Sequence, residues 1–174
     1  MTIEPNLDVM VATAIALVAV GWDLATRRIP NLLTLGAAIA ALAVHAYLEG
    51  FSGVWMSLSG WLVGAALLLP FFALGGMGAG DVKLMAALGA WLGPASIVWV
   101  ALYSSIAGGA LALVVAALSG YLKQAFKNLW SLLLQWHIAG VRPVPDLTLA
   151  SSRGPRLAYA VPVLAGLMVT LWLR

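Results

Sequence analysis

The sequence predicts an all-α, polytopic integral membrane protein with about six transmembrane helices, a short fourth helix and a cytoplasmic amphipathic segment. The 174-residue chain is 63% hydrophobic and only 9% charged, and its mean hydropathy is +1.03. A soluble domain carries about 25% charged residues, so this chain cannot cover a water-facing surface. Its apolar residues also fall into six segments, several near the length of about 20 residues that spans a bilayer. We expect one membrane domain over residues 1–174.

The six apolar segments are separated by polar residues, glycine or proline. They are residues 7–22, 32–48, 54–74, 82–92, 95–119 and 157–173. The acidic residues Glu4 and Asp8 precede or open the first segment, and no Lys or Arg does. A cleaved secretory signal has a basic start, so we expect this segment to be retained as a span.

The fourth segment is too short to cross a membrane alone. Its 11 residues would rise about 16 Å as a helix, against a hydrocarbon core of about 30 Å. Either the glycine-rich stretch 75–81 continues it, or it is a half-helix buried among its neighbours. Non-helical backbone at membrane depth is tolerated only beside protein or water. We therefore expect residues 75–81 to border a wet, protein-lined cleft.

The one sizeable loop, residues 120–156, contains an amphipathic pattern. Read as a helix, it begins near Lys123 and Lys127 and gathers four apolar side chains on one face. These are Leu129, Leu132, Leu133 and Trp136. The pattern predicts a segment that lies on the inner membrane surface.

The distribution of Lys and Arg predicts the orientation in the membrane. With the N-terminus outside, eight of these residues lie on or near the cytoplasmic side: Arg27, Arg28, Lys83, Lys123, Lys127, Arg142, Arg153 and Arg156. Only Arg174 lies outside, together with the acidic residues Glu4, Asp8 and Glu49. Both termini are therefore expected outside, and Asp23 and Asp81 both fall at the cytoplasmic face.

These two aspartates are the candidate catalytic residues. Only six residues of the chain are acidic, and an ionisable group at membrane depth costs roughly 3 kcal/mol, which favours a functional role. If Asp23 and Asp81 meet, they form a carboxylate dyad that shares one proton and can activate a water molecule for peptide hydrolysis. Taken singly, Asp23 is explained as a polar end of a span and Asp81 as a helix N-cap.

The residues around the aspartates are candidates for substrate binding. Gly78 and Gly80 allow close approach of another chain, so an extended substrate could pair with the glycine-rich stretch by strand addition. Lys83 either holds an acidic substrate group or anchors the helix at the interface. Residues 29–31 read as a turn in which Asn31 caps the second helix. The chain has no cysteine and two distant histidines, so we expect no metal and no cofactor.

Two motifs together resemble the type IV prepilin peptidases, polytopic aspartic proteases of the GxGD class. They are Asp23 with Arg28-Ile29-Pro30-Asn31, and Gly78-Ala79-Gly80-Asp81-Val82-Lys83. The stretch Tyr159-Ala160-Val161-Pro162 is similar to the C-terminal pattern of that family, with Leu157-Ala158 in place of the expected proline. The resemblance runs over nearly the whole chain.

The resemblance implies a catalytic pair, Asp23 and Asp81, in a multi-pass protein of the cell inner membrane. The implied substrate is a prepilin or pseudopilin, whose short basic leader is cut after a glycine at the cytoplasmic face, ahead of a hydrophobic helix. The expected partners are this substrate and the lipid bilayer, with no nucleic acid. Assembly into a homo-oligomer is compatible with the sequence. Larger members carry a cysteine-containing part linked to N-methylation. This chain resembles the short, peptidase-only form of Flp-type (tight adherence) pilus systems, so cleavage without methylation is expected.

Two other functions are compatible with intramembrane aspartates. A proton- or cation-coupled transporter would use Asp23 and Asp81 as carriers. Such transporters usually contain repeats with matched broken helices, and this sequence has no evident repeat. The third possibility is a related intramembrane peptidase that cuts other membrane proteins. The residues that flank Asp23 favour a prepilin peptidase over this possibility.

Overall fold

The computed structural model describes residues 5–144, 148 and 157–173, and every regular element in these ranges is an α-helix. The helices are α1 (Pro5–Thr26), α2 (Asn31–Glu49), α3 (Phe51–Ala73), α4 (Ala79–Leu118), α5 (Leu122–Ala139) and α6 (Ala160–Trp172). Helices α1 to α4 are long and apolar enough to cross a membrane, and α6 is a shorter apolar helix. The predicted all-α polytopic fold is confirmed. Four residues of the charge count lie outside the described residues: Glu4, Arg153, Arg156 and Arg174.

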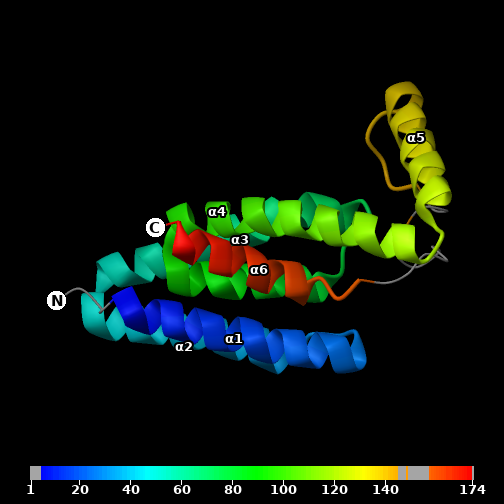
Figure 1. Cartoon of the computed structure of the whole chain (residues 1–174). Helices are drawn as coiled ribbons and strands as arrows, with labels where there is room; N and C mark the ends of the chain where they lie inside the picture. Colours follow the sequence, from blue (N-terminus) through cyan, green and yellow to red (C-terminus); the bar gives the residue numbers. More distant parts are fainter. Residues whose placement is uncertain (1–4, 145–147, 149–156, 174) are drawn as a thin grey trace.

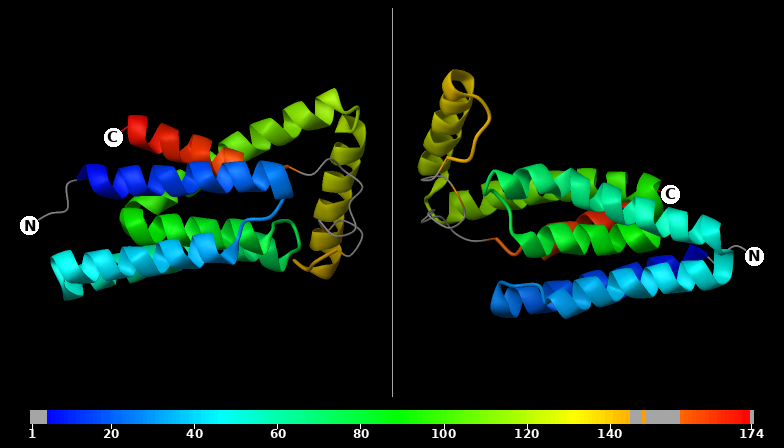
Figure 2. Two further views of the ribbon diagram at one scale, coloured as in Figure 1. Left: turned by 90° about the horizontal axis from the view of Figure 1, so that it is seen from below. Right: turned by 180° about the vertical axis from the view of Figure 1, so that it is seen from behind.

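Helix α4 is two helical arms that meet at Gly93. Gly93 has φ 77° and ψ 170°, a conformation that glycine adopts without the steric cost of a side chain. The chain reverses there, and the second arm, residues 94–118, runs back beside the first (Figure 2). The first arm, residues 79–92, would rise about 21 Å, still less than the hydrocarbon core. It is the predicted short fourth helix.

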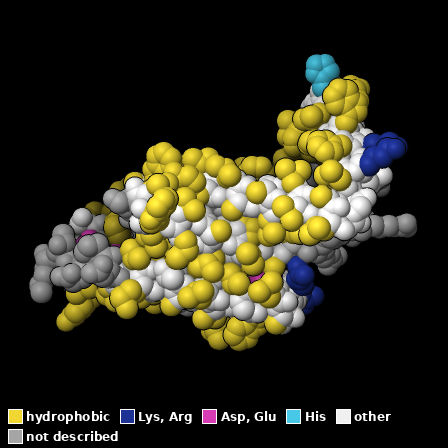
Figure 3. All heavy atoms as spheres, in the orientation of Figure 1, with side chains coloured by type: hydrophobic (Ala, Val, Ile, Leu, Met, Phe, Trp, Pro, Cys, Tyr) yellow, Lys and Arg dark blue, Asp and Glu magenta, His cyan; other side chains and the backbone are white. Residues whose placement is uncertain are grey.

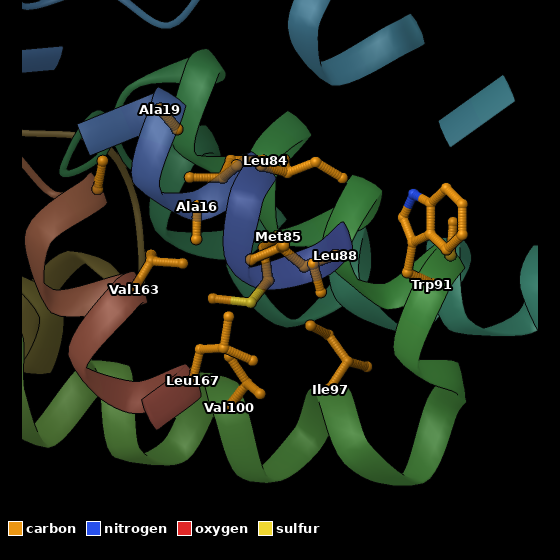
Figure 4. Close-up of a cluster of buried hydrophobic side chains, with 14 of the residues drawn as sticks. Ala16, Ala19, Leu84, Met85, Leu88, Trp91, Ile97, Val100, Val163 and Leu167 are labelled. Atoms are coloured by element: carbon orange, nitrogen blue, oxygen red, sulfur yellow. The ribbon is translucent and has the colours of Figure 1, made fainter. Parts of the chain in front are cut away.

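The first arm of α4 forms the centre of the bundle. Every residue from Leu84 to Trp91 is buried, and α4 packs against α1, α2, α3 and α6. Figure 4 shows Met85 and Leu88 of this arm facing Val100 of the second arm and Leu167 of α6. Both expectations for this segment hold in part, because it is a half-helix buried among its neighbours and residues 79–81 of the glycine-rich stretch continue it.

Helices α3 and α4 touch backbone to backbone. A Cβ built on Gly60 of α3 would overlap the carbonyl oxygen of Gly89 in α4, and a Cβ on Gly89 would overlap that of Gly60. Neighbouring Gly64 similarly abuts the backbone of Met85. Small residues at crossings are how helices gain van der Waals packing in lipid, where no hydrophobic effect drives their association.

The bundle has two different ends. Helix α1 begins and α6 ends at one of them, and α5 projects steeply from the other (Figure 1). Hydrophobic side chains cover the visible length of the bundle, while Lys and Arg side chains gather at the end that carries α5 (Figure 3). The predicted amphipathic segment is helix α5, whose Leu129 and Leu133 are each 50% exposed.

Candidate active site

Asp23 lies in the last full turn of α1 and is nearly buried, with 6% of its surface exposed. Its Oδ2 atom accepts a hydrogen bond of 3.2 Å from the backbone amide of Ala160. Ala160 is the first residue of α6, where backbone N–H groups have no partner within the helix and the helix dipole attracts negative charge. The start of α6 therefore both orients the Asp23 carboxylate and compensates its burial.

Asp81 lies in the first turn of α4. The N-cap of that helix is Gly78, so the interpretation of Asp81 as the N-cap is wrong. The Asp81 carboxylate instead reaches back and accepts a hydrogen bond from the Gly78 amide. This is the reciprocal half of a capping box, in which the side chain at the third helical position bonds to the N-cap amide.

Both carboxylates line one cavity of about 480 Å³ at the α5 end of the bundle. They are close enough for the charge of Asp23 to act on Asp81. All five predicted site residues border this cavity: Asp23, Asp81, Gly78, Gly80 and Lys83. So do Arg27, Arg28, Ile29, Asn31, Ala79, Leu157 and Tyr159. Within the described ranges, no group of three or more His, Asp or Glu side chains is arranged to hold a metal ion.

Asn31 connects two sides of the cavity. Its Oδ1 atom accepts a hydrogen bond of 2.8 Å from Lys83 Nζ. The structure makes Pro30 the N-cap of α2, with no side-chain capping bond, so the prediction that Asn31 caps this helix is wrong. Asn31 is free of that role because its side chain points across to α4, and the pair joins the starts of two helices at the cavity rim.

The last three residues of the glycine-rich stretch are helical. Helix α4 begins at Ala79, so Gly80 and Asp81 are not part of a loop. Before the helix, the amides of Gly75 and Gly76 donate to the carbonyls of Phe72 and Phe71, each at 2.9 Å. An extended substrate therefore cannot pair with the main chain along the whole of residues 75–81, because these amides and those of the first helical turn do not form an open strand edge.

Glycine at position 80 serves the packing of α4 against the turn before α2. A Cβ built on Gly80 would lie 3.3 Å from Cβ of Ile29, which is itself buried. This is closer than most real Cβ contacts. The absence of a side chain thus lets the segment that follows Asp23 lie directly on the segment that carries Asp81.

The start of α6 is the part of the site that sequence reasoning missed. Tyr159 lines the cavity, and its ring lies so close to Gly108 that a Cβ there would be 3.0 Å from Tyr159 Cε2. This contact fixes the end of α6 that presents the Ala160 amide to Asp23. The stretch Tyr159-Ala160-Val161-Pro162, which is similar to the family pattern, pointed to this region. It did not reveal the hydrogen bond to Asp23, because the donor is a backbone amide and not a side chain.

The fold and the cavity define a class of protein: a helical membrane protein with two carboxylates from different helices at one end of its bundle. The chain belongs to the type IV leader peptidase family, which it matches over residues 10–113. That range contains Asp23 and Asp81. No curated protein and no solved structure gives a significant match to the chain.

Membership of this family, together with the long apolar helices, makes the protein a multi-pass membrane peptidase. The family thus favours a peptidase over a transporter.

Proposed function

We propose that the protein is an aspartic endopeptidase of the GxGD class that removes the basic leader from prepilins or pseudopilins, with Asp23 and Asp81 as its catalytic pair. The observation that carries the proposal is the cavity that both carboxylates border, although they belong to helices far apart in the sequence. Each carboxylate also has a backbone amide to orient it, from Ala160 for Asp23 and from Gly78 for Asp81.

The chemistry follows from the sharing of one proton by two neighbouring carboxyl groups. The ionised carboxylate takes a proton from a water molecule, whose oxygen adds to the carbonyl carbon of the scissile bond. The protonated carboxyl group supports the developing negative charge on the carbonyl oxygen. Collapse of the intermediate breaks the C–N bond, and the leaving amine takes up a proton. Titration belongs to the pair and not to either residue.

Three further residues are proposed to bind the substrate. Lys83 gives one of its three N–H donors to Asn31 and holds a substrate carbonyl or carboxylate with another at the cavity rim. Gly78 and Gly80 contribute by lacking side chains, which leaves room for the substrate backbone beside Asp81.

The cavity is proposed to face the cytoplasm, with both termini outside. The described basic residues Arg27, Arg28 and Lys83 line the cavity, and Lys123 and Lys127 lie in α5 at the same end. Basic residues concentrate on the cytoplasmic side of membrane proteins. A leader that stays in the cytoplasm would then meet the carboxylates directly.

The test of the proposed function is coexpression of the chain with candidate prepilins. Wild-type protein is expected to convert a prepilin into a faster-migrating product on a gel, and the Asp81→Asn variant is expected to leave it unprocessed. If every candidate prepilin stays full length with wild-type protein present in the membrane, the proposal fails.

Substitution of Gly78 is expected to lower cleavage without unfolding the protein. A Cβ at position 78 would lie 3.1 Å from Asp81 Oδ2, so Gly78→Ala pushes the carboxylate away from its place. Misplacing a catalytic group by about 1 Å can cost roughly 100-fold, and we expect kcat/KM to fall about 10- to 100-fold. Initial rates of prepilin cleavage by purified protein measure this.

Gly76→Ala is the matched control for Gly78→Ala. It lies two residues away, and its Cβ would be 3.5 Å from the Phe71 carbonyl oxygen, an ordinary contact. Its rate is expected to stay within about threefold of the wild type, since nothing presses on Asp81. Equal losses in the two variants would show that the loop as a whole matters, and not the position of the carboxylate.

The reaction is proposed to stop at cleavage, without N-methylation. The chain has no cysteine, and only four residues separate the end of α1 at Thr26 from the start of α2 at Asn31. The cysteine-containing part that larger members carry near this point is missing. Intact-mass spectrometry of the product, with S-adenosylmethionine present, is expected to give the mass of the cut chain alone. An added methyl group would contradict this.

A further inference from the structure

An apolar groove leads away from the catalytic cavity along the side of the bundle. It consists of two adjoining hollows of about 370 and 220 Å³. The two hollows share Leu35 and Trp61, and the larger one shares Asn31 and Lys83 with the catalytic cavity. We call this continuous depression the lateral groove. It begins at Asn31 and Lys83 on the border of the catalytic cavity and runs toward the other end of the bundle.

Three helices form the lateral groove. Helix α2 supplies one wall, from Asn31 to Leu42, and α3 supplies the other, around Trp61. Three residues of the first arm of α4 lie on the floor: Val82, Ala86 and Ala90. Their spacing of four places them on one face of that helix. Two of the three are alanine, so a guest can come close to the α4 backbone.

The chemistry of the lateral groove defines its occupant. Its lining is almost entirely apolar beyond Asn31 and Lys83, apart from the small hydroxyl side chains of Thr34 and Ser57. A peptide chain that leaves the carboxylates along this path must therefore be apolar, since unpaired polar groups are costly there. At membrane depth its backbone must also satisfy its own hydrogen bonds, which requires a helix.

We propose that the lateral groove binds the apolar helix of the substrate that directly follows the scissile bond. The inference rests on the proposed function and identifies the part of the substrate that the enzyme holds while it cuts. From Asn31 to Leu42 the wall spans about 16 Å, which accommodates about three turns of helix. Lys83 and Asn31 stand at the junction, where the chain changes from the cut, hydrated segment to the buried helix.

Lateral access supports a substrate as the occupant. The α2 wall is open at its edge, where Leu35 is 60% and Ile39 is 59% exposed. An apolar helix already in the bilayer can therefore enter sideways, without leaving the lipid. A lipid acyl chain is the other apolar occupant available in a membrane, and the experiment separates the two.

Disulfide crosslinking in membranes tests the proposal. The chain contains no cysteine, so single-cysteine variants have no background. Leu35→Cys and Ile39→Cys place a thiol on the groove wall, each combined with Asp81→Asn to keep the substrate uncut. The probe is a prepilin that carries one cysteine at successive positions of the apolar segment after its scissile bond. Gly36→Cys and Ala40→Cys are matched controls, because each lies one residue away at the same depth but is turned by about 100° on α2.

We expect prepilin crosslinks at positions 35 and 39 at least tenfold above those at positions 36 and 40, with a period of three to four residues along the substrate. Both control positions are exposed, and neither lines the groove. Equal crosslinking at all four positions, or none, overturns the proposal and indicates that a lipid acyl chain occupies the groove. Cleavage by the protein with intact Asp81 is measured in the same membranes. Its absence would contradict the proposed function and the inference with it, whereas cleavage without the crosslinks overturns the groove alone.

Discussion

Replacing either Asp23 or Asp81 with asparagine is expected to lower kcat/KM for prepilin cleavage by about 10³-fold or more, with the protein still folded. An amide can neither take a proton from water nor share one with a neighbouring carboxyl group, and acid–base catalysis contributes about 10²- to 10⁴-fold. Asparagine keeps an oxygen that can accept the Ala160 or Gly78 amide, so the local hydrogen bonds survive. Initial rates with purified protein and one prepilin give the loss.

Glu49→Gln is the matched control for the two aspartate variants. Glu49 is the last residue of α2, at the end of the bundle away from the cavity (Figure 1). The change removes a carboxylate of the same kind without touching the site, and its cleavage rate is expected to equal that of the wild type. Thermal unfolding in detergent should match for all three variants. Processing at the wild-type rate by Asp23→Asn or Asp81→Asn would exclude that residue from the reaction.

Gly60→Ala is expected to destabilise the protein by about 3 kcal/mol or more, or to prevent its folding. The added methyl group would overlap the backbone of Gly89, which cannot move aside as a flexible side chain can. Helices α3 and α4 must then separate, and the loss of close contact in lipid is not offset by a hydrophobic gain. Overpacking of a buried contact typically costs about 1–3 kcal/mol, and overlap with backbone puts this substitution at or above the upper end of that range. Reversible unfolding in mixed micelles measures the change.

Gly36→Ala is the control for Gly60→Ala. Gly36 also lies inside a helix, but a Cβ there would meet nothing within 4 Å. Alanine favours a helix over glycine by up to about 1 kcal/mol, so Gly36→Ala is expected to be neutral or slightly stabilising. A Gly60→Ala protein as stable as Gly36→Ala would show that the two backbones do not cross as closely as described.

The fold was predictable because hydrophobicity reports directly on burial in lipid. The short fourth segment, too short to span, indicated a half-helix before its surroundings were known. The structure combines the two expectations for this segment, a buried half-helix and a continuation by part of the glycine-rich stretch. The first arm of α4 extends back to Ala79 and takes in Gly80 and Asp81. Helix formation there satisfies backbone groups at membrane depth better than a glycine loop can.

The side chains of the candidate site could be predicted from the sequence, whereas the backbone amides that orient them could not. Asp23 and Asp81 were conspicuous because acidic residues are rare in an apolar chain, and charge counting put both at one end. The amides of Ala160 and Gly78 belong to the backbone and leave no trace in the residue types, so only the structure reveals their hydrogen bonds to the carboxylates. Asn31 was misassigned for a similar reason, since its partner Lys83 is distant in sequence.

Asp8 illustrates a different limit of the sequence. Charge counting placed it on the outer side with Glu4 and Glu49 and gave it no partner. The structure puts its Oδ1 atom 3.8 Å from Nε2 of His45, a fully buried side chain of α2. Neither residue has a pattern that points to the other, because contacts between side chains of different helices depend on rotation and depth that hydrophobicity does not specify.

The pairing of the two aspartates is tested most directly by the double variant Asp23→Asn/Asp81→Asn. Residues that act as one unit are non-additive, because the loss of either removes what both achieve. Initial cleavage rates of the wild type, the two single variants and the double variant are compared on one prepilin. We expect the double variant to cleave within about threefold of each single variant. A double variant slower by the product of the two single losses would mean that Asp23 and Asp81 act independently, and would contradict a shared catalytic site.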